Sequence, residues 1–301
     1  MKKLTLLAVA VMAMVVFSCE KEDITSNEVV PQSVIDQLYG LGFNPDGIER
    51  VDNGYRIERD IIITDDYLKT QPVDVRVPDA EQYRTFNTVS TGGNRTITVY
   101  MEVEGTDSGG GGNNGNGNGN GGGRNKTSGA AFPSTYDLAL NEAIARFNNE
   151  NLDLSFARTS DQNAADIVVT RLNKRDERRG VLGSAGFPTS SGDPYNEILM
   201  SGVLETSYGL SVNGIATIIA HEMGHCIGFR HTDYFDRSIS CGSGGNEGQE
   251  TTGVGAVHIP GTPTGASLAD ASWMLSCSDG SDRPFNNDDS AALQWMYSGN
   301  F

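Results

Sequence analysis

Basic residues are scarce in this sequence. Its 22 Lys and Arg are outnumbered by 39 Asp and Glu, which gives a formal net charge of −17 over 301 residues. A protein that binds nucleic acid needs positive charge facing the phosphates, and no such concentration of basic residues is visible. Nucleic acid is therefore excluded as the expected partner. The net negative charge mainly favours solubility.

Long apolar runs are also missing, with one exception at the N-terminus. Lys2 and Lys3 precede an apolar run from Leu4 to Phe17, which is too short for a comfortable membrane span. This arrangement predicts a secretory signal peptide over residues 1–18. No other stretch is long and apolar enough to cross a bilayer.

The end of the signal peptide, Val16-Phe17-Ser18-Cys19, resembles a bacterial lipoprotein box. The resemblance implies cleavage before Cys19 and attachment of lipid to that residue. The alternative is an ordinary signal peptide with an incidental Cys. The following Lys21-Glu22-Asp23 resembles the surface-export signal of lipoproteins in Bacteroidetes-type bacteria. We therefore expect residues 19–30 to be a polar tether. The protein is then held by lipid in the cell envelope, at the outer membrane and exposed at the surface.

Histidine is scarce but concentrated, because three of only four His fall within eleven positions. The segment reads H-E-x-x-H-x-x-G-x-x-H, with His221, His225 and His231 as its histidines. The apolar residues 212–220 before it predict a helix. On a helix, His221 and His225 stand about 40° apart on one face. Gly228 can adopt the left-handed backbone that ends a helix, which lets the chain return His231 to the same place.

This histidine pattern is suited to a catalytic zinc ion. Three neutral imidazoles leave the ion with its full charge and an open position. We expect one Zn²⁺, held by His221, His225 and His231. The ion would lower the pKa of its bound water toward about 7. Glu222 lies beside these ligands and is expected to act as the general base while this water attacks a peptide carbonyl.

Cysteine is as scarce as histidine, with four in the chain. If Cys19 carries lipid, three are left in an oxidising setting. Cys226 lies on the helix face opposite the predicted zinc, so we expect a small buried core residue. Cys241 and Cys277 fall in loops that flank the site. We predict a disulfide between them, with two free thiols as the alternative.

Residues 31–92 lack cysteine altogether, so no thiolate from this region can bind the zinc and inactivate it. Asp60, Asp65 or Asp66 could do so in principle, but acidic loop residues are usually solvated. A strand is expected from Tyr55 to Ile63. We interpret this region as a small N-terminal subdomain or a propeptide without evident chemistry.

Residues 93–301 are predicted to form one peptidase domain of the α+β class. Within it, residues 105–129 are rich in Gly and Asn, cannot bury a core, and are expected to be a flexible insertion. Apolar periodicity predicts helices after Ser134, at 212–228 and near 288–296, and strands at 96–103, 152–156, 166–170, 180–187 and 197–200. The strand at 197–200 is expected to offer an edge to an extended peptide substrate.

The long histidine pattern, followed by Ser272-Trp273-Met274, resembles the metzincin clan of zinc peptidases. The segment from His221 to Asp233 is similar to the family called dual-action HEIGH metallopeptidases. The resemblance implies a metzincin-like domain with a twisted mixed sheet, an active-site helix, a Met-turn and a C-terminal helix. It also implies that Met274 lies beneath the zinc as a structural residue. Some metzincins carry Tyr two positions after that Met; here Ser276 stands there, so zinc alone is expected to stabilise the oxyanion.

The sequence therefore predicts an exported, lipid-anchored zinc metalloendopeptidase that acts on proteins or peptides. One alternative is a surface adhesion or binding lipoprotein with a structural zinc, which the presence of Glu222 disfavours. Another is a zinc hydrolase of non-peptide substrates. A separate hypothesis is calcium binding by an acidic run whose members more often cap helices or face solvent: Asp279, Asp282, Asp288 and Asp289. Cleavage specificity and oligomeric state stay open.

Overall fold

The computed structural model describes residues 30–41, 43, 47–70, 82–104, 131–245, 247, 255–263 and 265–299. The predicted signal peptide, Cys19 with the tether up to residue 29, and the insertion at 105–129 lie outside these residues. Within the described ranges, no helix has the length and hydropathy needed to cross a membrane.

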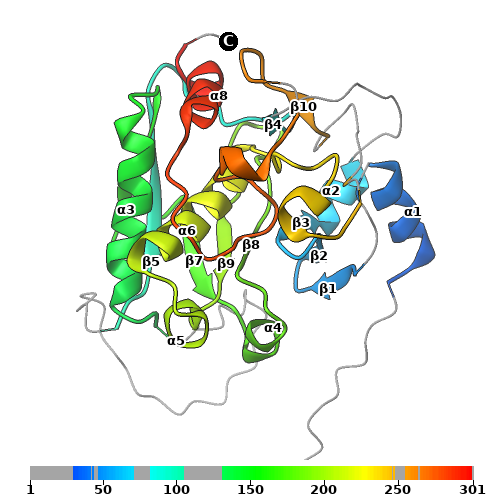
Figure 1. Cartoon of the computed structure of the whole chain (residues 1–301), viewed down its shortest axis with the longest axis horizontal. Helices are drawn as coiled ribbons and strands as arrows, with labels where there is room; N and C mark the ends of the chain where they lie inside the picture. The colour runs from blue at the N-terminus through cyan, green and yellow to red at the C-terminus, as the bar shows by residue number, and fades with distance from the viewer. Residues whose placement is uncertain are drawn as a thin grey trace, which may run out of the picture.

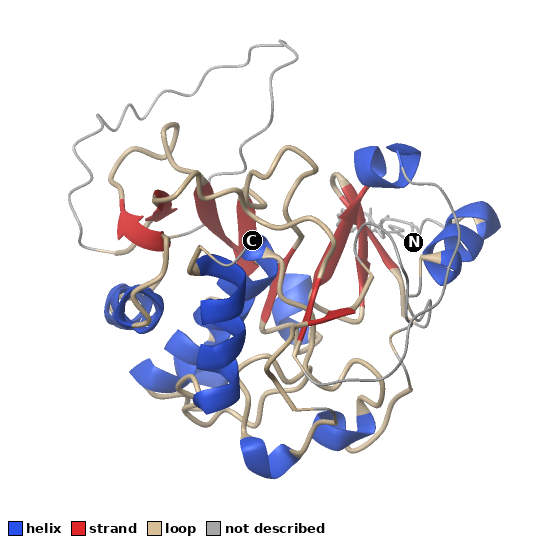
Figure 2. Cartoon of the chain, turned by 90° about the horizontal axis from the view of Figure 1, so that it is seen from above, coloured by secondary structure: helices blue, strands red, loops and turns tan. Residues whose placement is uncertain are grey.

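One eight-stranded mixed sheet runs through the molecule (Figures 1 and 2). Its strands lie in the order β1-β2-β3-β8-β9-β7-β5-β6. Neighbours β9, β7, β5 and β6 are parallel, whereas β8 is antiparallel to β9 and β1 to β3 form an antiparallel meander. The bounds are β1 Glu49–Val51, β2 Gly54–Ile57, β3 Ile61–Thr64, β5 Arg95–Met101, β6 Leu154–Arg158, β7 Ile167–Arg171, β8 Gly183–Ala185 and β9 Glu197–Met200.

Helices cover one face of the sheet and its two ends. In both views α3 and α1 lie at opposite ends of the molecule (Figures 1 and 2). A short second sheet pairs β4 (Tyr83–Arg84) with β10 (Val257–His258). The helices are α1 Gln32–Gly40, α2 Asp65–Thr70, α3 Thr135–Asn149, α4 Lys174–Arg178, α5 Leu204–Tyr208, α6 Val212–Ile227, α7 Ser238–Cys241, the 3-10 turn η1 Leu268–Asp270 and α8 Asn287–Tyr297. The predicted α+β class, with its mixed sheet, central helix and C-terminal helix, is confirmed.

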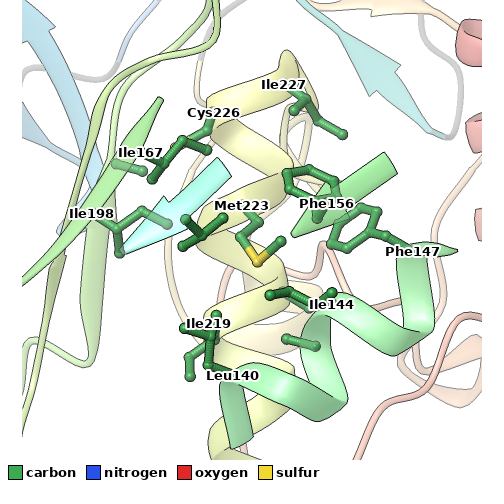
Figure 3. Packing of buried hydrophobic residues seen from close by; sticks show 14 of the residues in the cluster. Leu140, Ile144, Phe147, Phe156, Ile167, Ile198, Ile219, Met223, Cys226 and Ile227 are labelled. Atoms are coloured by element: carbon green, nitrogen blue, oxygen red, sulfur yellow. The ribbon is translucent and has the colours of Figure 1, made fainter. Parts of the chain in front are cut away.

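The main core lies between α3, α6 and the sheet (Figure 3). An apolar stripe of α3, formed by Leu140, Ile144 and Phe147, is buried there. Met223 and Cys226 of α6 are fully buried on the side facing this core, as predicted for Cys226. Each large apolar side chain removed from water stabilises the fold by about 1.5–3 kcal/mol, so this layer fixes α6 firmly.

A second, smaller hydrophobic cluster is made almost wholly by the N-terminal region. Its members from residues 38–68 pack around Ile57, Ile61 and Ile63, and Phe187 is the one buried member from later in the chain. The N-terminal region thus has a core of its own, although its strands extend the main sheet.

Two sequence predictions about strands are wrong. The segment from Tyr55 to Ile63 forms a hairpin instead of one strand, because Glu58 and Arg59 take left-handed backbone angles, φ 55° and 82°, that close a turn. The strand at 197–200 exists as β9 but has neighbours on both sides, β7 and β8. It therefore has no edge to offer a substrate. In addition, β8 is shorter than the predicted 180–187, and it too has neighbours on both sides, β3 and β9.

Candidate metal centre and active site

Helix α6 carries the first two histidines and is defined at both ends by local sequence. The Ser211 hydroxyl accepts a hydrogen bond from the Gly214 amide at 3.1 Å and caps the helix start. Gly228 ends it with φ 109°, the left-handed conformation that favours glycine. After this turn, the backbone amide of Arg230 donates to the carbonyl of Tyr83 in β4 at 2.8 Å. The chain is thereby held so that His231 returns to α6.

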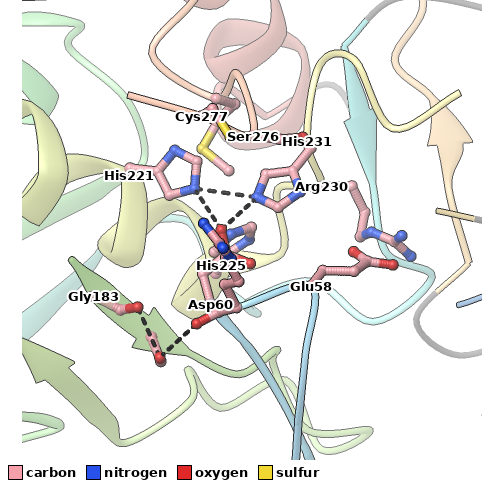
Figure 4. A network of polar contacts seen from close by, with 12 residues as sticks. Glu58, Asp60, Gly183, His221, His225, Arg230, His231, Ser276 and Cys277 are labelled. Carbon is pink, nitrogen blue, oxygen red and sulfur yellow. Dashed lines mark hydrogen bonds and ion pairs between the residues drawn. The ribbon is translucent and has the colours of Figure 1, made fainter. Parts of the chain in front are cut away.

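The three imidazoles converge on one point (Figure 4). Their ring centroids are 4.8 to 5.2 Å apart, and the Nε2 atoms of His221 and His231 are 3.3 Å apart. The spacing of the motif therefore does bring His221, His225 and His231 together, as the sequence predicted. All three are buried.

The outer nitrogen of each imidazole is occupied. Nδ1 of His221 donates to the carbonyl of Trp273 and Nδ1 of His225 to that of Phe229, each at 2.9 Å. Nδ1 of His231 is 2.7 Å from Oε1 of Glu247. In the neutral form of each imidazole, a hydrogen on Nδ1 leaves Nε2 with a lone pair directed inward. Nε2 of His225 is buried without a hydrogen-bond partner in the described structure. A metal ion fits this donor set and would satisfy that atom.

Burial tunes the first two imidazoles toward metal binding, which requires the neutral form. Burial, then the charge of His231, lowers the pKa of His221 to about 4. Burial, with the charge of His221 next, lowers the pKa of His225 well below its ordinary value. For His231 burial also acts downward, but the charges of Glu247 and Asp60 outweigh it and raise the pKa well above 6.5.

Glu222 lies next to the histidines with a carboxylate free for chemistry. It is 2% exposed, and its Oε2 has no hydrogen-bond partner among the described residues. Burial, followed by the charge of Asp60, raises its pKa well above 4.5, so the group favours holding a proton. A Cβ built on Gly183 would lie 2.4 Å from Oε1 of Glu222. Only glycine lets β8 pass so near the carboxylate.

Asp60 was named from the sequence as able to reach the zinc in principle, but it was expected to be solvated. Its Oδ2 lies 3.1 Å from Nε2 of His231 and 3.9 Å from Nε2 of His221, and one carboxylate oxygen joins the three histidines as a fourth donor. The expectation that acidic residues of this region are solvated holds for Asp66, whose side chain is 92% exposed. It fails for Asp60, which is buried because the turn after Glu58 and Arg59 directs it inward.

Glu247 was not predicted. It is fully buried, contacts His231, and lies 3.5 Å from Arg230, although Glu247 itself belongs to no helix or strand. No helical or strand periodicity marks such a residue, so only a search for an acidic partner of His231 could have suggested it.

The turn at Ser272 to Leu275 packs against α6. Trp273 and Met274 are buried, and a Cβ on Gly224 of α6 would lie 2.5 Å from the Trp273 ring and 2.8 Å from Sδ of Met274. The amide of Thr232 donates to the carbonyl of Met274 at 2.8 Å, which ties the turn to the segment after His231. Met274 thus packs against the turn of helix between the two histidines, the position expected for it.

The family described as dual-action HEIGH metallo-peptidase matches residues 123–297, more than half of the chain. The chain belongs to this family. The match spans the histidine motif and the Met274 turn, and it confirms the resemblance stated from the sequence.

Solved structures with a related arrangement are distant. The structure of myroilysin matches with a TM-score of 0.35 and 10% identity, covering 71% of this chain and all of that one. The GM1-bound form of the ECX AB5 holotoxin matches with a TM-score of 0.36 and 15% identity, covering 76% and 94%. At these values neither says anything about the function of this chain. No curated protein matches.

In this metallopeptidase, Cys241 and Cys277 form a disulfide, the pairing proposed from the sequence. It joins the end of α7 to the segment after Met274. Ser240 strengthens the same junction, because its hydroxyl donates to Asp233 at 2.6 Å and accepts from the Cys277 amide at 2.9 Å. Ser276, at the position where some metzincins carry Tyr, donates to Asp233 and Glu247 at 2.7 and 2.9 Å. It is a structural partner of these carboxylates.

A cleft of about 700 Å³ opens beside His221 and Glu222. Its lining includes residues 180–183 before and within β8, Leu210, Ile218 and residues 275–281. Glu58, Arg59 and Asp60 also line it. The cleft can hold several residues of a peptide, but the N-terminal turn stands in it.

The calcium hypothesis finds no support in the described part of the chain. Asp279 contacts Arg283 and Ser281, Asp282 contacts Arg146, and Asp289 is fully buried in a capping box with Asn286. None of these carboxylates belongs to a group of described residues that converges as metal ligands do. They act instead as salt-bridge partners and helix caps.

Proposed function

We propose that this protein is an exported, lipid-anchored zinc endopeptidase in which His221, His225 and His231 hold the ion and Glu222 is the general base. The observation that carries the proposal is the convergence of three inward-facing Nε2 atoms next to a buried carboxylate that lines a cleft. Three nitrogen donors suit zinc, and family membership supports metal-dependent peptide hydrolysis.

A bound zinc ion would supply positive charge that makes water more acidic and offsets charge developing on the substrate carbonyl. The side chains then divide the remaining work. Oε2 of Glu222 accepts a proton from the attacking water and later delivers it to the leaving amine nitrogen. The raised affinity of this carboxylate for a proton, caused first by burial, favours the acceptance step.

The decisive experiment is made in the Asp60→Ala chain, whose histidines no longer face that carboxylate. It compares Glu222→Gln with intact Glu222 in a digestion assay on denatured protein substrates, with zinc content measured in both. We expect the variant to keep zinc and to lose at least about a hundredfold in rate, the usual contribution of a positioned general base. Glu102→Gln, an exposed glutamate in the same chain, is the matched control. Equal rates in Glu222→Gln and the control would refute the assigned role.

One observation favours the alternative of a binding lipoprotein with structural zinc. Asp60 provides a fourth donor, and four protein ligands are typical of closed structural sites. Under that alternative, neither the unchanged protein nor any Asp60 variant cleaves protein, and removal of Asp60 destabilises the metal.

The proposal of a lipid anchor rests on the sequence from Leu4 to Asp23. Signal peptide, lipobox resemblance and acidic export signal together support attachment through Cys19 at the outer membrane, facing outward. A surface position would give the cleft access to extracellular proteins or peptides as substrates.

A further inference from the structure

The turn between β2 and β3 has a conformation that its own residues do not favour. Glu58 and Arg59 both have positive φ, 55° and 82°, although neither is glycine. Contacts from the catalytic part hold this shape: the Ala185 amide donates to the Asp60 carbonyl at 2.8 Å, and Arg237 donates to the Glu58 carbonyl at 3.1 Å. Strained backbone that is held by surrounding contacts is a feature of functional sites.

The result of this conformation is the placement of the Asp60 carboxylate. Oδ2 stands among the Nε2 atoms of His221, His225 and His231, all within 4.8 Å of one another (Figure 4). Carboxylate oxygen is an ordinary zinc ligand, and three histidines with one carboxylate complete a tetrahedral set. The place that Asp60 occupies is the one that a catalytic site keeps open for water and substrate.

The same segment also covers the strand nearest to Glu222. β8 passes against Glu222 at Gly183, and its outer edge pairs in parallel with β3 through Ile61 and Ala185. An extended peptide that binds at this edge needs the backbone groups of Ser184 and Ala185. The Ala185 amide is already used by Asp60, and the Ser184 hydroxyl donates to the Arg59 carbonyl at 3.3 Å.

The segment is joined to the catalytic part by contacts that are separable. Its apolar side chains pack mainly in the N-terminal cluster, and only Ile62 and Val51 reach the main core. From the other side, Phe187 packs in the N-terminal cluster. The remaining links include two ion pairs: Arg56 pairs with Asp176 at 3.0 Å, and Glu49 pairs with Arg179. Displacing the hairpin therefore exposes little of the main core.

From these contacts we infer that the β2–β3 hairpin is an internal inhibitor, in which Asp60 is the fourth ligand of the zinc ion while β3 covers the substrate edge of β8. The inference rests on the proposed zinc site. The chain as described is the latent form, and the cleft becomes competent when residues 49–64 are displaced from β8 and the histidines. Asp60 and the edge contact act together, since one turn carries both.

The test uses Asp60→Ala and the isosteric Asp60→Asn in the full chain, with cobalt replacing zinc as a spectroscopic probe. Asp66→Asn, an exposed position in α2 just after the hairpin, is the matched control. We expect the visible cobalt spectrum to change in both Asp60 variants and not in the control. Acetohydroxamic acid should bind the variants at least about tenfold more tightly. The apparent affinity of a ligand is its intrinsic affinity multiplied by the fraction of molecules in the open form, and that fraction should rise when Asp60 is removed.

Each outcome of this experiment either supports or overturns the inferred inhibition. Unchanged spectra and unchanged hydroxamate affinity in both Asp60 variants would show that Asp60 does not ligate the ion, and would overturn the inference while leaving the peptidase proposal intact. Loss of cobalt from both variants would assign Asp60 to a permanent structural site and also overturn it. Changed spectra and tighter hydroxamate binding without any cleavage of protein would support the inhibitory contact and count against the peptidase proposal.

Discussion

At the scale of single residues, the site depends on what lies behind each ligand. The outer nitrogens of His221 and His225 bond to backbone carbonyls of the Met274 turn and of Phe229. His231 differs, since its outer nitrogen meets a carboxylate, that of Glu247, which is itself surrounded by Arg230, Arg237 and Ser276. Such a carboxylate fixes the orientation of the ring and raises its basicity as a ligand.

Replacing Glu247 should therefore weaken metal binding without touching the metal. We expect Glu247→Ala to lower zinc affinity by about 10- to 100-fold, the usual effect of removing a partner of a metal-binding histidine. Glu247→Gln keeps an acceptor for Nδ1 and should lose less. Competition with a chromophoric chelator measures both, with Glu104→Ala, an exposed glutamate, for comparison. Equal affinities in all three would mean that Glu247 has no influence on His231.

At the scale of elements, α8 begins at a buried acidic cap. Asp289 accepts hydrogen bonds from the Asn286 amide at 3.0 Å and from the Ser272 hydroxyl at 2.7 Å. Because Ser272 belongs to the turn that carries Met274, the start of α8 is linked to the turn that packs against the active-site helix. Burial raises its pKa from 3.8 to about 6, against the lowering effect of these hydrogen bonds.

This shift predicts a pH dependence of stability. The folded chain binds the Asp289 proton more tightly than the unfolded chain, so the contribution of this group is full below pH 3.8 and is lost as the pH rises through 6. The free energy of unfolding of wild type, relative to Asp289→Asn, should fall by up to about 3 kcal/mol between pH 3.5 and 7. Urea denaturation across that range tests this. Parallel curves for the two proteins would contradict the buried, protonated cap.

The disulfide between Cys241 and Cys277 also stabilises the arrangement of these elements. It closes a loop with a sequence separation of 36 residues between α7 and the segment after Met274. Loop-closure entropy gives a stabilisation of about 4 kcal/mol for a loop of this length. The double variant Cys241→Ser, Cys277→Ser should lose roughly that amount in chemical denaturation. A reducing agent should destabilise wild type equally and leave the variant unchanged; a further loss in the reduced variant would point to another redox-sensitive contact.

At the scale of the whole molecule, the N-terminal sequence and the catalytic part make separate contributions. If lipid on Cys19 is the anchor, Cys19→Ala should move the protein from the membrane fraction to the soluble fraction and abolish incorporation of labelled palmitate in cells. The soluble form should keep the peptidase activity of the anchored one, because the cleft is built from residues after 57. Unchanged incorporation of labelled palmitate in Cys19→Ala would rule out this anchor.

The sequence by itself determined the part of the site that lies within one stretch of chain. Helical spacing places His221 and His225 on one face, Gly228 ends the helix, and His231 follows within reach. Apolar periodicity likewise located α3, α6, α8 and the parallel strands. These features depend on interactions between residues close in sequence, whose geometry is set by the backbone.

Only the tertiary structure decided what surrounds the histidines. Asp60 reaches them through a turn whose positive φ values at Glu58 and Arg59 are not marked by a glycine in the sequence. Glu247 reaches them from a position that belongs to no helix or strand. β9 is not the edge strand that was expected, because β8 pairs with its free side, and β3 pairs with the other side of β8. Such contacts join residues far apart in the chain. They depend on how the whole chain packs, which no local spacing or composition encodes.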